Sequence, residues 1–220
     1  VQLDDGAFVE LSARLRRELA TIGAFASEPG GKRAAETRNP ATGGPAVRLH
    51  PASVLALDDF GADLGSWTID RKGKQRLASV RQALAAEPRV PSTLQGELRP
   101  YQHAGFCWLS RLGRVGLGAC LADDMGLGKT IQILALLLER GAAASGPAMV
   151  VAPTSVCGNW MAEARRFAPT LTLIDFATAD RLAAVAALGP RDVLVTSYGL
   201  MTREVELLAS VAFDVIVLDE

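Results

Sequence analysis

The sequence predicts an α/β fold, a parallel β-sheet with helices on both faces, preceded by a smaller and mostly helical region. From about Leu98 onward, short apolar runs alternate with segments of helical periodicity, the pattern of βαβ units. Before Pro91 that alternation is absent. At 49% hydrophobic and 21% charged, the 220 residues can bury a globular core. We therefore expect an accessory region over residues 1–92 and a sheet domain over residues 93–220.

The sheet domain is predicted element by element from its apolar runs. Five runs are the expected strands: Gly118–Ala122, Ala148–Ala152, Leu171–Asp175, Asp192–Thr196 and Asp214–Leu218. A helical segment follows each of the first four: Lys129–Arg140, Ser155–Phe167, Asp180–Leu188 and Gly199–Ala209. In open sheets of this kind, ligands bind at the carboxyl ends of the strands. Residues that directly follow a predicted strand are therefore the first candidates for a site.

The accessory region carries two helical patterns, about Ala7–Ala26 and roughly Lys74–Ala86. Between them, Glu28–Pro45 is rich in Gly, Pro, Arg and Thr and is predicted to be a loop. No group of residues there suggests a chemistry, and we predict no function for it.

Composition excludes several classes of protein. Lys and Arg total 23 against 24 Asp and Glu, so the chain does not hold nucleic acid by bulk charge, and any contact must be a local surface. The three cysteines form no CxxC pair and, with two histidines, no zinc site, which predicts buried thiols in a reducing compartment. Without a signal peptide or a membrane-spanning run, we expect a cytoplasmic protein. The chain opens without Met and closes within a motif, so we expect a fragment of a longer protein.

A phosphate-binding loop is predicted after the first strand, at Asp123–Thr130, before an almost wholly apolar helix. Two glycines let successive backbone N–H groups face one anion, and the helix N-terminus adds its dipole. Lys129 can reach the β- and γ-phosphates of ATP, and the Thr130 hydroxyl can hold Mg²⁺. The alternative is an ordinary turn with chance glycines, and Asp123 stands where the usual pattern has Gly. The predicted ATP-binding residues of the loop are Asp124, Met125, Gly126, Leu127, Gly128, Lys129 and Thr130.

An acid pair, Asp219 and Glu220, follows the last predicted strand. Both acids are therefore expected on the sheet edge where the phosphate loop lies. Asp219 would hold the Mg²⁺, and Glu220 would polarise the attacking water as a general base. Two acids at a chain end are usually a solvated terminus, but an upstream phosphate loop favours the catalytic interpretation.

Several motifs, spread over just over half of the chain, resemble one family. They are Leu98-Arg99-Pro100-Tyr101-Gln102, Trp108-Leu109, Leu121–Thr130, Val151-Ala152-Pro153, Asn159-Trp160, Thr196-Ser197-Tyr198 and Asp219-Glu220. On these residues the chain resembles the Swi/Snf family of DNA-dependent ATPases in helicase superfamily two. The stretch Asp123–Thr130 is the most specific, since Asp123 is itself usual in that family. The Ala- and Arg-rich composition suits a bacterial source.

The resemblance implies roles for matching positions. Gln102 would read the adenine edge, because an amide can pair with both N6 and N7; the alternative is a surface helix residue. Residues that follow two of the strands would contact the DNA backbone, and helix capping can coexist with that role: Pro153, Thr154, Ser155, Thr196, Ser197 and Tyr198. Trp160 is at helical spacing from Phe167, which favours a place in the core.

The resemblance also implies the architecture and the activity. The chain would be the first RecA-like domain of a motor, truncated at the Asp-Glu motif, with ATP and Mg²⁺ as cofactors. Its partners would be double-stranded DNA and DNA-bound protein, in a nucleoid-associated bacterial enzyme. A second RecA-like domain with arginine fingers is missing, so we expect no turnover by the fragment. The alternatives are another superfamily-two helicase or restriction-type motor, or a non-catalytic ATP-dependent DNA-binding module.

Overall fold

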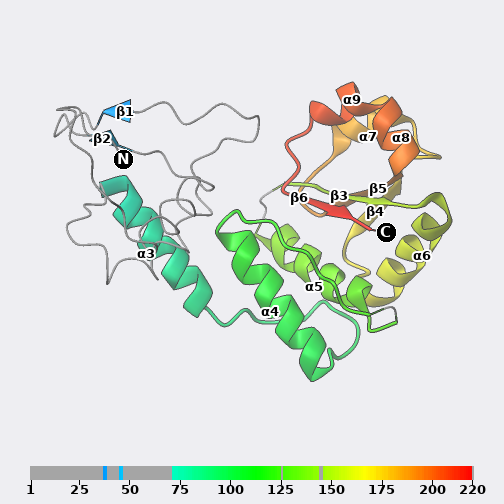
Figure 1. Ribbon diagram of the computed structural model, residues 1–220. Coiled ribbons are helices and arrows are strands. Elements are labelled where there is room, and N and C mark those ends of the chain that lie inside the picture. The colour runs from blue at the N-terminus through cyan, green and yellow to red at the C-terminus, as the bar shows by residue number, and fades with distance from the viewer. Residues whose placement is uncertain (1–36, 39–44, 47–70, 125, 144–145, 220) are drawn as a thin grey trace. The chain divides into compact units, whose positions relative to one another are not determined.

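The computed structural model describes residues 37–38, 45–46, 71–124, 126–143 and 146–219 (Figure 1). The chain divides into two compact units, Val1–Leu84 and Ala85–Glu220. In the first, the described elements are an antiparallel pair of short strands, β1 (Thr37–Arg38) and β2 (Pro45–Ala46), and helix α3 (Arg71–Ala85). The predicted helix Ala7–Ala26 lies outside the described residues. The predicted boundary at residue 92 stays a prediction.

A four-stranded parallel sheet forms the centre of the second unit. Its strands are β3 (Ala148–Ala152), β4 (Thr172–Asp175), β5 (Asp192–Ser197) and β6 (Val215–Leu218), in the order β4-β5-β3-β6. All five residues of β3 are buried, because this strand has a neighbour on each side and helices on both faces. The α/β fold with a parallel sheet is therefore confirmed, and four of the five predicted strands are present.

Helices cover both faces of the sheet (Figure 1). They are α4 (Pro100–Arg114), α5 (Lys129–Ala142), α6 (Thr154–Phe167), α7 (Arg181–Ala187), α8 (Tyr198–Arg203) and α9 (Val205–Ala209). One apolar cluster joins α4, α5 and α6 to one face, with Phe106, Leu134 and Trp160 among its members. A second cluster joins α7, α8 and α9 to the other face. None of the described helices is long and apolar enough to cross a membrane.

The predicted strand Gly118–Ala122 was wrong. Residues 117–124 belong to no regular element, and Gly118, Ala119 and Cys120 are exposed. A strand needs a neighbour with which its backbone can form a ladder, and apolar composition alone does not supply one. The same exposure corrects the prediction of three buried thiols, because Cys120 is exposed while Cys107 is buried.

The predicted helix Gly199–Ala209 is two short helices, α8 and α9. They meet at Glu204, whose φ of −107° and ψ of 23° lie outside the helical range. The Glu204 carboxylate accepts a hydrogen bond from Arg181 of α7 at 2.6 Å. Hydrophobic periodicity continues through such a break, which is why the pattern predicted one helix.

A bidentate ion pair fixes the last turns of α5 to the start of β6. The Arg140 Nε donates to Asp214 Oδ2 at 2.7 Å, and a second guanidinium nitrogen donates to Oδ1. The hydrogen bond with Asp214 raises the pKa of Arg140. The helix that begins at the phosphate loop is thereby joined to the strand that ends at the acid pair.

Candidate nucleotide-binding site

The phosphate loop curls through two glycines in the left-handed region. Gly126 has a φ of 83°, and Gly128, the N-cap of α5, has a φ of 77° and a ψ of 48°. Residues with a β-carbon rarely adopt these angles, so both positions require glycine. The Lys129 Nζ donates to the carbonyl oxygen of Asp123 at 2.7 Å and lies 3.5 Å from that of Asp124. The ammonium group is therefore held by the loop's own carbonyl groups.

Gln102, in the first turn of α4, holds the same loop from outside. Its Nε2 donates to the carbonyl oxygen of Leu127 at 2.9 Å, and its Oε1 accepts from the Arg99 backbone N–H at 2.9 Å. The Tyr101 hydroxyl donates to the same Leu127 oxygen at 3.1 Å. Gln102 is only 8% exposed, so it is not a surface helix residue. Its predicted contact with adenine stays a prediction.

Gln132 is a residue of the site that the sequence did not single out. It is completely buried in α5, and its Nε2 donates to Asp123 Oδ2 at 3.0 Å and to the Gly128 carbonyl oxygen at 3.3 Å. A β-carbon at Gly105 of α4 would overlap its Oε1. The signal in the sequence was one amide within the otherwise apolar run Ile131–Leu138. The hydrogen bond from Gln132 also gives Asp123 a structural role, at the position where the usual phosphate-loop pattern has Gly.

Asp219, just after β6, is held by three hydrogen bonds. Its backbone N–H donates to the carbonyl oxygen of Val151 at 2.8 Å, and its own carbonyl oxygen accepts from the Tyr198 hydroxyl at 2.7 Å. The Trp160 indole Nε1 donates to its Oδ2 at 2.7 Å. Trp160 is 4% exposed, so its predicted place in the core is confirmed, and it also contacts the acid. Glu220 and Met125 lie outside the described residues.

The predicted DNA contacts divide into exposed and buried residues. Pro153 is the N-cap of α6, and Thr154 and Ser155 are exposed in its first turn. The Ser197 Oγ accepts from the Leu200 N–H at 3.3 Å and caps α8. Thr196, inside β5, is only 2% exposed. Its side chain does not reach the surface, so we do not retain Thr196 as a DNA contact.

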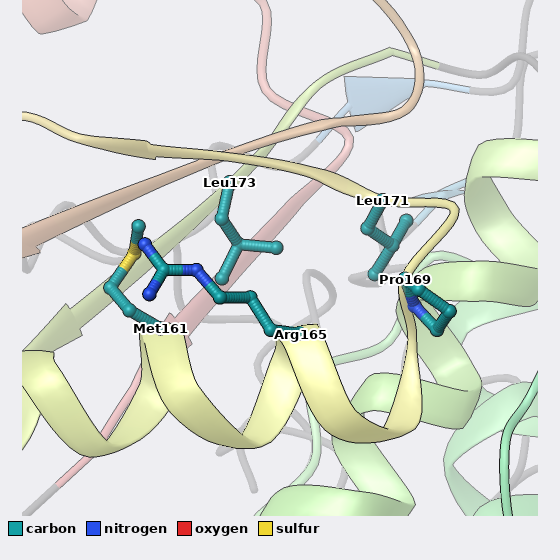
Figure 2. Close-up of a pocket in the computed structure, with 5 residues that line it drawn as sticks. All are labelled: Met161, Arg165, Pro169, Leu171 and Leu173. Carbon is teal, nitrogen blue, oxygen red and sulfur yellow. The ribbon is translucent and has the colours of Figure 1, made fainter.

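A small hollow of about 160 Å³ lies apart from these residues, between α6 and residues 169–173, which lead into β4 and form its start. Figure 2 shows Met161 and Arg165 on α6 opposite Leu171 and Leu173, with Pro169 at one end. No residue predicted to bind ATP or DNA lines it.

Comparison with known proteins decides the family. The sequence profile of the SNF2-related domain matches residues 101–220, more than half of the chain. The chain belongs to the SNF2 family. The resemblance drawn from the motifs is therefore confirmed.

Individual SNF2 relatives match over similar spans. The chain is 42% identical over 164 residues to a putative ATP-dependent helicase/translocase of Bacillus subtilis, covering 67% of this chain and 17% of the relative. It is 42% identical over 141 residues to an ISWI chromatin-remodeling complex ATPase of Arabidopsis thaliana, covering 59% and 13%. The chain thus spans less than a fifth of the length of these relatives.

The solved structures support the same family. The SWI2/SNF2 ATPase core of Sulfolobus solfataricus in complex with double-stranded DNA matches with a TM-score of 0.53 and 36% identity. The match covers 60% of this chain and 28% of that one. The same core domain without DNA matches with a TM-score of 0.51 and 35% identity, over 59% and 26%. The sheet of this SNF2 chain is therefore that of a RecA-like domain.

Proposed function

We propose that this chain is the ATP-binding part of a DNA-dependent ATPase that moves along double-stranded DNA and remodels protein–DNA complexes. Two features of the site, taken together, carry the proposal. The phosphate loop holds the Lys129 ammonium group within its curl, and the RecA-like sheet presents Asp219 at the carboxyl end of β6. Anionic phosphates and a divalent cation are the ligands that suit this pair of features.

The residues of the site fit ATP and Mg²⁺. Phosphate oxygens can replace the carbonyl groups that accept from Lys129, because an anionic acceptor attracts the ammonium group more strongly than a neutral carbonyl oxygen does. The Thr130 hydroxyl and the Asp219 carboxylate are hard oxygen ligands of the kind that Mg²⁺ prefers. Mg²⁺, when bound, would neutralise charge on the phosphates. Glu220 is proposed to accept a proton from the attacking water.

The DNA contact is proposed on the first turn of α6 and at the start of α8. Thr154 and Ser155 offer exposed hydroxyl groups beside backbone N–H groups at the N-terminus of a 14-residue helix, which suits phosphate oxygens. Pro153, Ser197 and Tyr198 are the remaining candidates. The DNA in the Sulfolobus solfataricus complex supports this substrate, and the relatives named as chromatin-remodeling ATPases support DNA-bound protein as the partner.

We further propose that the chain works within a longer protein, in a bacterial, cytoplasmic and nucleoid-associated setting. The relatives' greater length supports this proposal. Phosphoryl transfer depends on charge stabilisation, and an arginine finger is worth about 10³–10⁵ in rate. A second domain would supply such a finger. The 220-residue chain alone should therefore bind nucleotide and release negligible phosphate, with or without duplex DNA.

Two measurements test the proposal. Binding of a fluorescent ATP analogue to the chain should be lost in Lys129→Ala, since the variant lacks the ammonium contact to the phosphates. Unchanged affinity would refute the phosphate-loop assignment. Phosphate release from the same chain should stay at background. Robust DNA-stimulated release that disappears in Lys129→Ala would show that the site is complete without a second domain.

The competing activities are separated by assays on the longer protein. A translocase on double-stranded DNA should displace a bound protein or a triplex strand without separating the duplex. Strand separation would favour a helicase of the same superfamily. ATP-dependent DNA binding without hydrolysis would favour the non-catalytic module.

A further inference from the structure

We propose that Trp160 and Tyr198 are positioning residues for Asp219, fixing the metal-binding acid from the two helices whose first turns carry the proposed DNA contacts. The inference rests on the proposed function of Asp219. It assigns tasks to two side chains that the metal site does not itself include.

Trp160 restrains the carboxylate itself. Its indole N–H donates to Asp219 Oδ2 at 2.7 Å, and its ring is 4% exposed within the apolar cluster beneath the sheet. A buried indole has few alternative rotamers, so the donor is stationary. A hydrogen bond to one carboxylate oxygen sets the rotation of the group about its χ2 bond. The described residues give Oδ1 no hydrogen-bond partner, which leaves that oxygen for a cation.

Tyr198 and the sheet restrain the backbone of the same residue. The Tyr198 hydroxyl donates to the Asp219 carbonyl oxygen at 2.7 Å, and the Asp219 N–H continues the ladder to Val151 at 2.8 Å. Backbone and side chain are thus held by different elements, namely α8, β3 and α6. Partners that orient a metal-binding carboxylate typically contribute about 10–100-fold to metal affinity.

The two donors lie on the helices proposed to contact DNA. Trp160 is six residues beyond Thr154, the first residue of α6, and Tyr198 is itself the first residue of α8. A shift of either helix on contact with DNA would therefore move a hydrogen-bond donor of Asp219. This gives DNA a physical route to the metal site through the hydrogen bonds of Trp160 and Tyr198 with Asp219.

The test uses conservative variants of the 220-residue chain. Trp160→Phe removes the N–H group and keeps an aromatic ring in the core, and Tyr198→Phe removes only the hydroxyl of a side chain that is 39% exposed. Trp108→Phe is the matched control, because Trp108 is 42% exposed on α4. Affinity for a fluorescent ATP analogue is measured in saturating Mg²⁺ and in EDTA. The ratio of the two affinities reports the contribution of the metal.

The parent chain should bind more tightly in Mg²⁺ than in EDTA. Trp160→Phe should lower this ratio by about ten-fold and leave the affinity in EDTA unchanged. Tyr198→Phe should lower it by a smaller factor, and Trp108→Phe should match the parent. The inference is overturned if Trp160→Phe and Tyr198→Phe both show the same ratio of affinities in Mg²⁺ and EDTA as the parent. An equal loss in Mg²⁺ and EDTA also overturns it, since that result reports packing alone.

Tyr198→Phe keeps the test decisive if Trp160→Phe does not fold, because the exposed ring leaves the core untouched. The inference and the proposed function fail in different ways. If the parent binds nucleotide in a manner that depends on Lys129 and is enhanced by Mg²⁺, but the variants keep the parent's ratio of affinities, only the inference fails. Absence of nucleotide binding by the parent removes the proposed function and the inference with it.

Discussion

The side-chain nitrogen of Gln102 lies 2.9 Å from the carbonyl oxygen of Leu127, which joins the first turn of α4 to the middle of the phosphate loop. Tyr101 donates to the same oxygen, so two neighbouring side chains of one helix hold one peptide group of the loop. The Gln102 side chain therefore supports the shape of the loop and is also the predicted contact with adenine. Mutations can separate these two roles.

Gln102→Ala should erode the preference for ATP over GTP several-fold. The amide matches the donor and acceptor of adenine, guanine presents the opposite pattern, and a lost paired contact costs on the order of 1 kcal/mol. Competition by each nucleotide against a fluorescent ATP analogue measures the change. Tyr101→Phe is the control, since it removes the other donor to Leu127 and should affect both nucleotides equally. If GTP competes equally well in Gln102→Ala and in the parent, then Gln102 supports the loop and does not contact adenine.

Two glycines on α4 should respond in opposite ways to the same substitution. Gly113→Ala meets no atom within 4 Å and should raise the free energy of unfolding by up to about 1 kcal/mol, because alanine loses less entropy in a helix. Gly105→Ala should give no such gain and should weaken nucleotide binding, because its β-carbon would displace Gln132 from Asp123. Urea unfolding and nucleotide titration measure the two effects.

The double variant Gly105→Ala, Gln132→Ala isolates the clash. Removing the Gln132 side chain makes room for the new β-carbon, so the double variant should be more stable than the sum of the two single changes predicts. Strict additivity of the two changes would contradict this account of Gly105.

The ion pair between Arg140 and Asp214 should contribute more stability than a more exposed pair. The two side chains are 23% and 11% exposed, and the guanidinium forms two hydrogen bonds to one carboxylate. Arg140→Ala should lower the free energy of unfolding by about 1–3 kcal/mol, because it leaves Asp214 without its partner. Arg181→Ala is the control, since that side chain is 41% exposed and its single contact with Glu204 should contribute less than about 1 kcal/mol. Equal losses in urea unfolding would contradict this ranking.

The three thiols should react at different rates. Burial raises the pKa of the Cys107 and Cys157 thiols, so less of each is in the reactive thiolate form at pH 8. Cys120 is exposed in the segment before the phosphate loop. A disulfide reagent that releases a coloured thiolate should show one fast equivalent per folded chain, which Cys120→Ser removes. Three fast equivalents in the folded chain would contradict the slower reaction expected of Cys107, which is buried, and Cys157, which is partly buried.

Sequence reasoning succeeded where a local pattern carries the structure. The run Ala148–Ala152 is wholly apolar because β3 is buried on all sides, and the strand occupies those residues without a shift. The Asp123–Thr130 motif identified the loop, since backbone positions with positive φ angles are occupied by glycine, which is visible in the sequence. Gly118–Ala122 resembled β3 in composition, but pairing depends on a neighbouring strand that composition does not report.

The contacts that order the site could not be predicted, because they join residues far apart in the chain. Trp160 and Asp219 are 59 positions apart, and only the packing of α6 against the sheet brings them together. Helical spacing predicted that Trp160 is buried, and nothing in that spacing indicates which atom its N–H meets. The partner of Gln132 is only nine positions away, but hydrophobic periodicity does not indicate that its amide contacts Asp123.

The contact of Lys129 with the loop carbonyl groups has a consequence for the energetics of nucleotide binding. An ammonium group that already donates at 2.7 Å has been removed in part from water before any ligand arrives. Binding is then an exchange, in which phosphate oxygens take over donors that the carbonyl groups release. The net free energy of binding is the difference between two sets of hydrogen bonds. The entropy cost of ordering the Lys129 side chain is small, because the loop already holds it. The affinity of the loop for nucleotide therefore depends on the free energy needed to break the hydrogen bonds between Lys129 and the loop carbonyl groups.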